Sequence, residues 1–112
     1  MTVQPSTDLL QGLQILTSPA VRDVIRERIE QLDKHCHTPE HDAGHVEGEL
    51  AQAAACYALQ PQLLRWFQDN DVYLWPFEQA SWKPSTRRKD LVKAAALLLA
   101  EIDRLDSLEQ PS

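Results

Sequence analysis

All four histidines of the chain and one of its two cysteines lie within eleven consecutive residues. The members of this group are His35, Cys36, His37, His41 and His45. Imidazole and thiolate groups bind divalent metals, and an imidazole beside a carboxylate can transfer protons. So dense a group predicts either a functional site or a polar entrance to a helix, and this choice is the main question about function.

The best-placed metal ligands in this region have the spacing of one helix edge. His41, His45 and Glu49 follow one another at intervals of four, and Asp42 lies beside them. A continuous helix would stack these side chains, and such a spacing can chelate Mg²⁺, Mn²⁺ or Zn²⁺. Glu101 would add a ligand from the last helix, because metal sites in helical bundles draw carboxylates from facing helices.

Other interpretations of these residues stay open. Asp90 could supply the ligand from the last helix, and Cys36, His41 and His45 can be drawn as a zinc site. In a purely structural alternative, the acidic residues favour the helix N-terminus and no metal is bound. The sequence has no arrangement typical of a catalytic nucleophile and no phosphate-binding glycine loop, so we predict no catalytic residue and no definite cofactor.

A second set of candidates is cationic or aromatic and would contact a ligand or a partner protein. The set is Arg28, Trp75, Trp82, Arg87, Arg88 and Lys93. For a nucleotide, Arg28 or Lys93 would meet the phosphate and one of the tryptophans would stack on the base. The alternative is that the aromatic side chains of residues 60–84 complete a core that is otherwise short of large residues.

Four segments carry helix signals. Ser18-Pro19 and Thr38-Pro39 predict helix starts, because Ser or Thr at the N-cap and Pro at the first helical position favour them. These helices are expected to end near residues 34 and 59, and two further helices are expected at 61–68 and 85–108. The fold class is therefore all-α, a small helical bundle of three main helices with short helices and an aromatic-rich ordered loop.

Helical periodicity predicts the buried faces. In the first main helix the apolar stripe is Val21, Val24, Ile25, Ile29 and Leu32. In the second it is Val46, Leu50, Ala53, Ala54 and Tyr57. In the last it is Leu91, Ala95, Leu98, Ile102 and Leu105. Arg28 falls inside the first stripe, so its guanidinium must reach solvent or meet a carboxylate.

Two further features of the helices need an explanation. Gly48 is expected inside the second helix, where a close approach by another backbone or ring would account for it. The last helix begins with Arg87, Arg88 and Lys89 and ends with acidic residues. This order opposes the helix dipole, so a partner, a ligand or contacts between helices should explain it.

Length and composition fit one small domain. Residues 18–108 are expected to form it, with 1–17 as an arm or short helix and 109–112 as a tail. The net charge of −6 does not favour nucleic-acid binding. Two cysteines suit a reducing cytosol, and no signal peptide or membrane-length apolar run is seen, so a cytoplasmic protein without a membrane partner is expected.

Two long stretches, TPEHDAGHVEGELAQAAACYA from Thr38 and WKPSTRRKDLVKAAALLLAEIDRL from Trp82, carry a resemblance. Together with Glu27-Arg28 they resemble a family of small, largely uncharacterised proteins encoded by bacteriophages and prophages. The resemblance spans residues 20–106 and implies a setting in the cytoplasm of an infected or lysogenic bacterium. It brings no established activity, and the family's acidic-glycine-aromatic turn is replaced here by residues 34–37.

A more distant similarity links the chain to the all-α nucleotide pyrophosphohydrolases of MazG type. Those enzymes hold magnesium between acidic residues of two neighbouring helices. Asp42 and Glu49, with Asp90 and Glu101, are the residues that the similarity would place there. Those enzymes carry acidic pairs spaced by three, but here Arg104 follows Glu101 at that spacing and Gln52 follows Glu49.

Three functions remain as hypotheses. The first, which we favour, is a phage accessory protein that binds a host or phage protein and inhibits a defence or replication factor. The second is a metal-dependent nucleotide hydrolase. The third is a module that binds and sequesters a nucleotide without chemistry. A homo-oligomer is expected in each case, because the Ala-rich helices and the N-terminal leucines offer surface to a second copy.

Overall fold

The computed structural model describes residues 7–34 and 48–109, and this part of the chain is all-α, as predicted. Its helices are α1 (Thr7–Leu16), α2 (Pro19–Lys34), α4 (Glu49–Ala58), α5 (Pro61–Asp69), the short 3₁₀ helix η1 (Gln79–Ser81) and α6 (Arg87–Glu109). No strand occurs in these ranges. No helix in the described part of the chain is long and apolar enough to cross a membrane.

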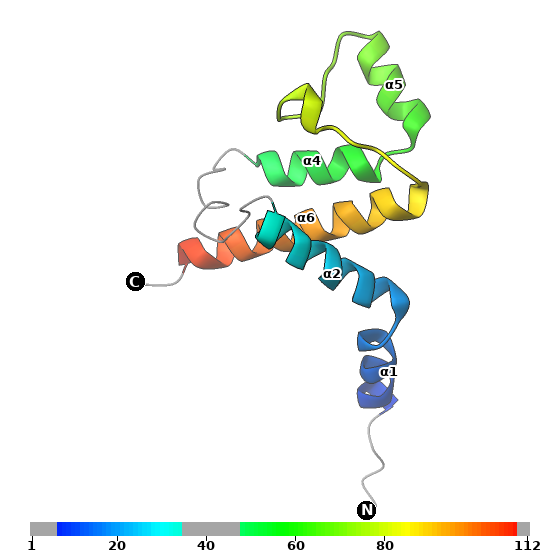
Figure 1. Ribbon diagram of the computed structural model, residues 1–112, viewed down its shortest axis with the longest axis vertical. Helices are drawn as coiled ribbons and strands as arrows, with labels where there is room; N and C mark the ends of the chain where they lie inside the picture. Colours follow the sequence, from blue (N-terminus) through cyan, green and yellow to red (C-terminus); the bar gives the residue numbers. More distant parts are fainter. Residues whose placement is uncertain (1–6, 35–47, 110–112) are drawn as a thin grey trace, which may run out of the picture.

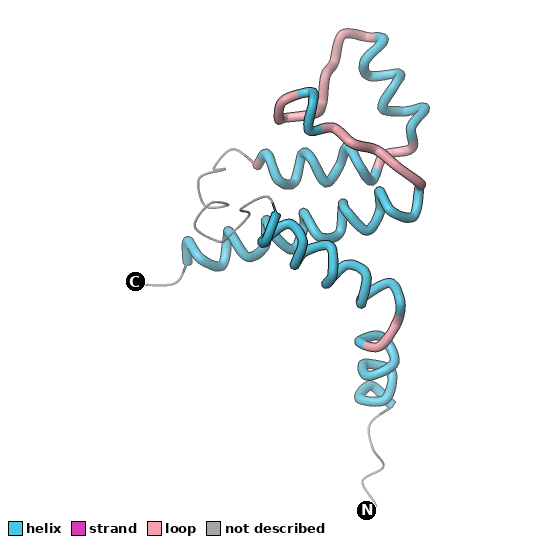
Figure 2. The backbone as a smooth tube through the Cα atoms, viewed as in Figure 1, coloured by secondary structure: helices cyan, strands magenta, loops and turns pink. Residues whose placement is uncertain are grey.

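Helix α6 is the centre of the molecule (Figure 1). Both α4 and α2 pack against it, with α4 running in the opposite direction to α6. Helix α5 and η1 lie on the far side of α4 from α6, and the chain between α5 and α6 is mostly loop (Figure 2). Helix α1 extends away from this body and contacts α2 near their junction.

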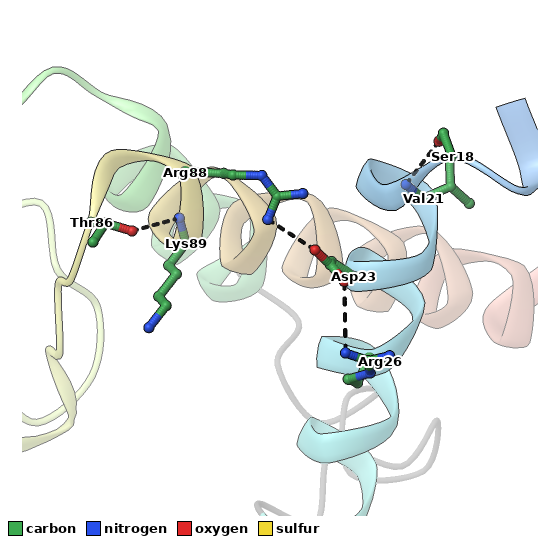
Figure 3. Close-up of polar contacts among 7 residues, drawn as sticks. All are labelled: Ser18, Val21, Asp23, Arg26, Thr86, Arg88 and Lys89. Atoms are coloured by element: carbon green, nitrogen blue, oxygen red, sulfur yellow. Dashed lines mark hydrogen bonds and ion pairs between the residues drawn. The ribbon is translucent and has the colours of Figure 1, made fainter.

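Local hydrogen bonds explain where the helices start (Figure 3). Ser18 Oγ accepts from the backbone N–H of Val21 at 3.3 Å, so the predicted cap of the first main helix is confirmed. Thr86 Oγ1 accepts from the N–H of Lys89 at 3.2 Å and caps α6 in the same way. The α6 cap is therefore one residue later than the predicted start.

The end of α5 is fixed by a Schellman motif. Asp71 has a left-handed backbone (φ 62°), and its N–H donates to the Gln68 carbonyl at 3.0 Å. The N–H of Val72 donates to the Phe67 carbonyl at 2.8 Å. These two bonds satisfy carbonyls that the helix end would otherwise leave unpaired, and they turn the chain into the aromatic loop.

Gly48 corrects the prediction of one continuous helix from 38 to 59. Its backbone is left-handed (φ 84°), and it caps α4, which starts at Glu49. A left-handed residue interrupts an α-helix, so the helix that holds Glu49 begins at that residue, and His45 lies outside the described residues. No described atom lies within 4 Å of a Cβ built at Gly48, so backbone conformation, and not a close neighbour, accounts for the glycine.

The core lies between α4 and α6 and is built largely from small side chains. Its buried members are Leu50, Ala53, Ala54, Tyr57, Ala94, Leu97 and Ala100. Alanines on both helices allow the backbones to approach closely, and Trp75, Phe77 and Trp82 pack against the edge of this cluster. The predicted stripe of α4 is confirmed for its four described members, while Val46 lies outside the described residues.

The predicted buried face of α6 is wrong. Leu91, Leu98, Ile102 and Leu105 are between 43% and 52% exposed, and the buried face carries Ala94, Ala96, Leu97, Ala100, Asp90 and Arg104 instead. Helix α2 shows the same discrepancy, because Ile25 and Ile29 are exposed whereas Arg28 and Gln31 are buried. The face of each helix that meets its neighbours is therefore the smaller or more polar one.

Candidate functional site

The described structure has a cleft of about 850 Å³. Its lining comes from α2, α4, α6 and the loop of residues 75–83. The lining residues are Glu27, Gln31, Ala53, Tyr57, Trp75, Pro76, Phe77, Glu78, Ala80, Ser81, Lys83, Lys93 and Leu97. The volume is in the range of ligand pockets, and the lining combines apolar rings with a few polar groups.

Aromatic rings form one wall of this aromatic cleft. Trp75 meets the edge of Tyr57 with ring centroids 5.5 Å apart, and it meets Phe77 in the same way at 5.6 Å. Trp82 packs against the other two large rings, 4.6 Å from Tyr57 and 4.8 Å from Trp75. These contacts, edge-to-face between Trp75 and its neighbours Tyr57 and Phe77 and tilted for Trp82, restrict the orientation of the rings, so the wall is preorganised before any ligand binds.

Hydrogen bonds from the helices anchor the loop that carries these rings. Gln52 Nε2 donates to the Leu74 carbonyl at 2.6 Å, and Lys93 Nζ donates to the Lys83 carbonyl at 2.8 Å. The Lys83 N–H donates to the Tyr57 hydroxyl at 3.3 Å. The loop is thus tied to both α4 and α6, which explains how a segment with little regular structure keeps a defined wall.

The indole N–H of Trp75 is also fixed. It donates to the Glu78 carbonyl at 3.0 Å and to Ser81 Oγ at 3.2 Å, and Ser81 Oγ donates to the same carbonyl at 2.6 Å. The turn at η1 therefore holds the indole by its polar edge. The rest of the Trp75 ring is left for apolar contact, within the protein and toward the cleft.

Gln31 gives the cleft an unused hydrogen-bond acceptor. This side chain is 6% exposed, and among the described residues no donor reaches its Oε1 atom. A buried amide oxygen without a donor costs about 1–3 kcal/mol. Glu27, one turn earlier on α2, lines the same cleft, so this helix contributes two residues with acceptor oxygens to the lining.

The ammonium group of Lys93 already has two contacts within the protein. Lys93 Nζ lies 5.3 Å from the centroid of the Tyr57 ring, in addition to its bond to the Lys83 carbonyl.

Burial raises the pKa of the Tyr57 phenol, the hydrogen bond from the Lys83 N–H lowers it, and the charges of Asp90 and Glu27 raise it further. The phenol is therefore a neutral wall group at physiological pH.

The other predicted cations also have partners within the protein. Arg28 is buried and lies 3.7 Å from Asp103, which confirms the expectation that it meets a carboxylate. Arg87 donates to the carbonyls of Ala58 and Leu59, at 2.6 and 2.8 Å, and so caps the end of α4. Neither of these arginines lines the cleft, and of the predicted ligand-binding residues only Trp75 and Lys93 do.

Arg88 connects α6 with α2 (Figure 3). Its guanidinium lies 2.9 Å from Asp23, and Asp23 also lies 3.8 Å from Arg26. Trp82 lines a separate, smaller hollow of about 170 Å³ beside α5. Arg88 and Trp82 therefore act in packing between elements, outside the main cleft.

Two of the predicted metal ligands, Glu49 and Glu101, lie in the described part of the chain, and both interact with Arg104. Glu101 binds Arg104 Nε and raises the pKa of that guanidinium, and the charge of Glu49 raises it as well. Arg104 thus supplies the positive charge for carboxylates that come from two different helices. Asp90, the alternative ligand, accepts from the Ser85 N–H at 2.7 Å.

The metal site itself stays a prediction. His41, Asp42 and His45 lie outside the described residues, as do His35, Cys36 and His37. Within residues 7–34 and 48–109, no group of three His, Cys, Asp or Glu side chains could hold a metal ion. The remaining cysteine, Cys56, is buried beside α5, and burial raises the pKa of its thiol.

The helical side of the cleft was not predicted from the sequence. Gln31 is three residues after Arg28 and seven after Val24, so it occupies the buried stripe of α2. A polar residue at such a position was the available signal.

Comparison of the chain with protein-family models, with curated proteins and with solved structures gives no match.

Proposed function

We propose that this protein is a non-enzymatic binding protein that holds a segment of another polypeptide in the aromatic cleft. The observation that carries the proposal is the combination of a fixed aromatic wall with the unused acceptor of Gln31. An apolar side chain of the bound segment would pack on Trp75 and Phe77. A donor of that segment would satisfy Gln31 Oε1 or pair with Glu27.

The state of the charged residues favours a polypeptide over a nucleotide. Lys93 already contacts a carbonyl and a ring, and Arg28 is buried beside Asp103. Neither is free to receive a phosphate without giving up a contact. A peptide needs no concentrated positive charge, and its N–H groups are the donors that the α2 side of the cleft lacks.

The resemblance to phage proteins suggests the source of the partner. We propose a host or phage protein, and a host defence or replication factor that the binding would inhibit. The net charge of −6 suits a partner with a basic surface, since complementary charge speeds encounter and selects against other surfaces.

A matched pair of variants on η1 tests the proposal. Ala80 lines the cleft and Gln79 does not, although both are exposed and adjacent. Ala80→Arg should fill the cleft mouth, whereas Gln79→Arg adds the same charge outside it. Each protein would be applied to an array of peptides that tile host and phage proteins.

The expected result is a set of peptides that the wild type and Gln79→Arg bind and that Ala80→Arg binds at least about tenfold more weakly. Tryptophan fluorescence would report the same binding in solution, because Trp75 lines the cleft. Equal binding by all three proteins would refute the cleft as the site. Thermal stabilisation by a nucleoside triphosphate, in the absence of any peptide binding, would refute the polypeptide ligand.

A further inference from the structure

The exposed stripe of α6 has a symmetry that its position in the fold does not explain. Leu91 and Leu105 lie seven residues before and after Leu98, and Ile102 lies one turn beyond Leu98. All four side chains are exposed, on the side of α6 that neither α2 nor α4 covers. A monomer rarely exposes a continuous row of large aliphatic side chains, so this apolar stripe indicates an interface.

We propose that the stripe pairs with the α6 helix of a second copy of this chain, antiparallel, about a two-fold axis beside Leu98. In this register Leu98 meets its own counterpart, and Leu91 of each copy meets Leu105 of the other. Repeats of seven residues keep such contacts on one helix face along their whole length. A two-fold interface requires a self-complementary surface, and a stripe centred on one residue provides it.

The charges at the ends of α6 select the second copy as the occupant and fix its direction. Arg88 and Asp106 are eighteen residues apart, which is five helical turns, so both lie along the same edge of the stripe. The antiparallel register brings Arg88 of one copy within about 3 Å, along the axis, of the level of Asp106 in the other. Arg88 is 59% exposed despite its contact with Asp23, and Asp106 is exposed.

The same pairing explains a charge order that works against the helix dipole. Helix α6 begins with Arg87, Arg88 and Lys89, and its last turn has no basic residue. An antiparallel neighbour places its acidic end beside the basic start, and it also sets the two helix dipoles in opposition. A parallel pair would instead place like charges together at both ends.

Sedimentation equilibrium tests the pairing first. The wild type should give twice the chain mass of 12.7 kDa. Leu98→Glu should raise the dimer dissociation constant about a hundredfold or more, because two carboxylates would face each other across an apolar contact. Leu63→Glu, at a similarly exposed position on α5, is the matched control and should remain dimeric. A monomeric wild type, or a dimeric Leu98→Glu protein, would overturn the proposal.

Cysteine cross-linking in a Cys36→Ser background tests the direction. Leu98→Cys should form a covalent dimer on oxidation, because the two positions meet at the axis. Leu91→Cys alone should not, since its two copies would lie about 21 Å apart. A mixture of Leu91→Cys and Leu105→Cys chains should cross-link. Self-linking of Leu91→Cys would show a parallel pair and overturn the register.

Discussion

The two sides of α6 differ in hydrophobicity, and the more apolar side is the exposed one. The side that meets α4 and α2 carries alanines, one leucine, Asp90 and Arg104, whereas the uncovered side carries three leucines and an isoleucine. Small side chains let α4 approach closely, and the rings of the aromatic loop then supply the missing volume. On α6, therefore, most of the large aliphatic residues lie on a surface available to partners, and the core face is built mainly from small residues.

The largest effect should come from the core side. Leu50 is fully buried in α4, so Leu50→Ala should lower the free energy of unfolding by about 2–5 kcal/mol. Leu99→Ala removes the same atoms from an exposed position of α6 and should change the free energy of unfolding by less than about 0.5 kcal/mol. Urea denaturation of both variants measures the difference. Similar losses at the two positions would break the comparison.

An enlarged side chain tests whether close approach is the role of the alanines. Ala100 is fully buried between the helices, so Ala100→Leu should cost about 1–3 kcal/mol by overpacking. Ala55→Leu, on the exposed side of α4, should be close to neutral. Thermal unfolding of the two proteins would show the contrast. A stable Ala100→Leu protein would mean that the core has room to spare.

A substitution at Gln31 tests the role of the cleft in both stability and binding. Gln31→Met keeps the length of the side chain and removes the acceptor that lacks a donor. It should therefore raise the free energy of unfolding by about 1 kcal/mol while weakening binding of the peptides found with the wild type. Chemical denaturation and a fluorescence titration give the two values. A destabilised variant would show that the oxygen is already satisfied in the free protein.

The smallest effect is expected from alkaline pH. Burial raises the Tyr57 pKa above its usual 10.0, so the folded state favours the neutral phenol. The stabilisation that follows is complete below pH 10 and is lost as the pH rises through the folded pKa. Melting temperatures between pH 8 and 11 should fall less steeply for Tyr57→Phe than for the wild type. If the melting temperatures of the two proteins fall equally with pH, Tyr57 is not the cause of the alkaline destabilisation.

The fold class and several boundaries could be predicted because they depend on local chemistry. Ser18-Pro19 and Pro61 mark helix starts wherever the chain packs, and the buried face of α4 follows its own periodicity. The α6 face could not be predicted, because a stripe of leucines has the same pattern whether it meets the core or a second molecule. Gly48 was misplaced for a similar reason, since a glycine between helical patterns does not reveal its φ angle.

Of the residues that line the candidate site, only Trp75 and Lys93 were predicted. Trp75 stands out in composition, and it does line the cleft. Gln31 and Glu27 come from another helix, so their meeting with the rings depends on tertiary packing. The cations were assigned to a ligand because sequence shows charge but not partners, and in the structure Arg28 and Arg87 contact groups of the protein itself.

The central place of α6 has a consequence for synthesis. Both α4 and α2 find their main packing surface on residues 87–109, far along the chain. On the ribosome, the earlier helices must wait until this segment has emerged before their buried faces can be covered. The nascent chain therefore spends several seconds, at about 5–20 residues per second, with its core open. The nascent chain should therefore need chaperones most during that interval. Gene variants that slow translation just before residue 87 should lower the yield of soluble protein.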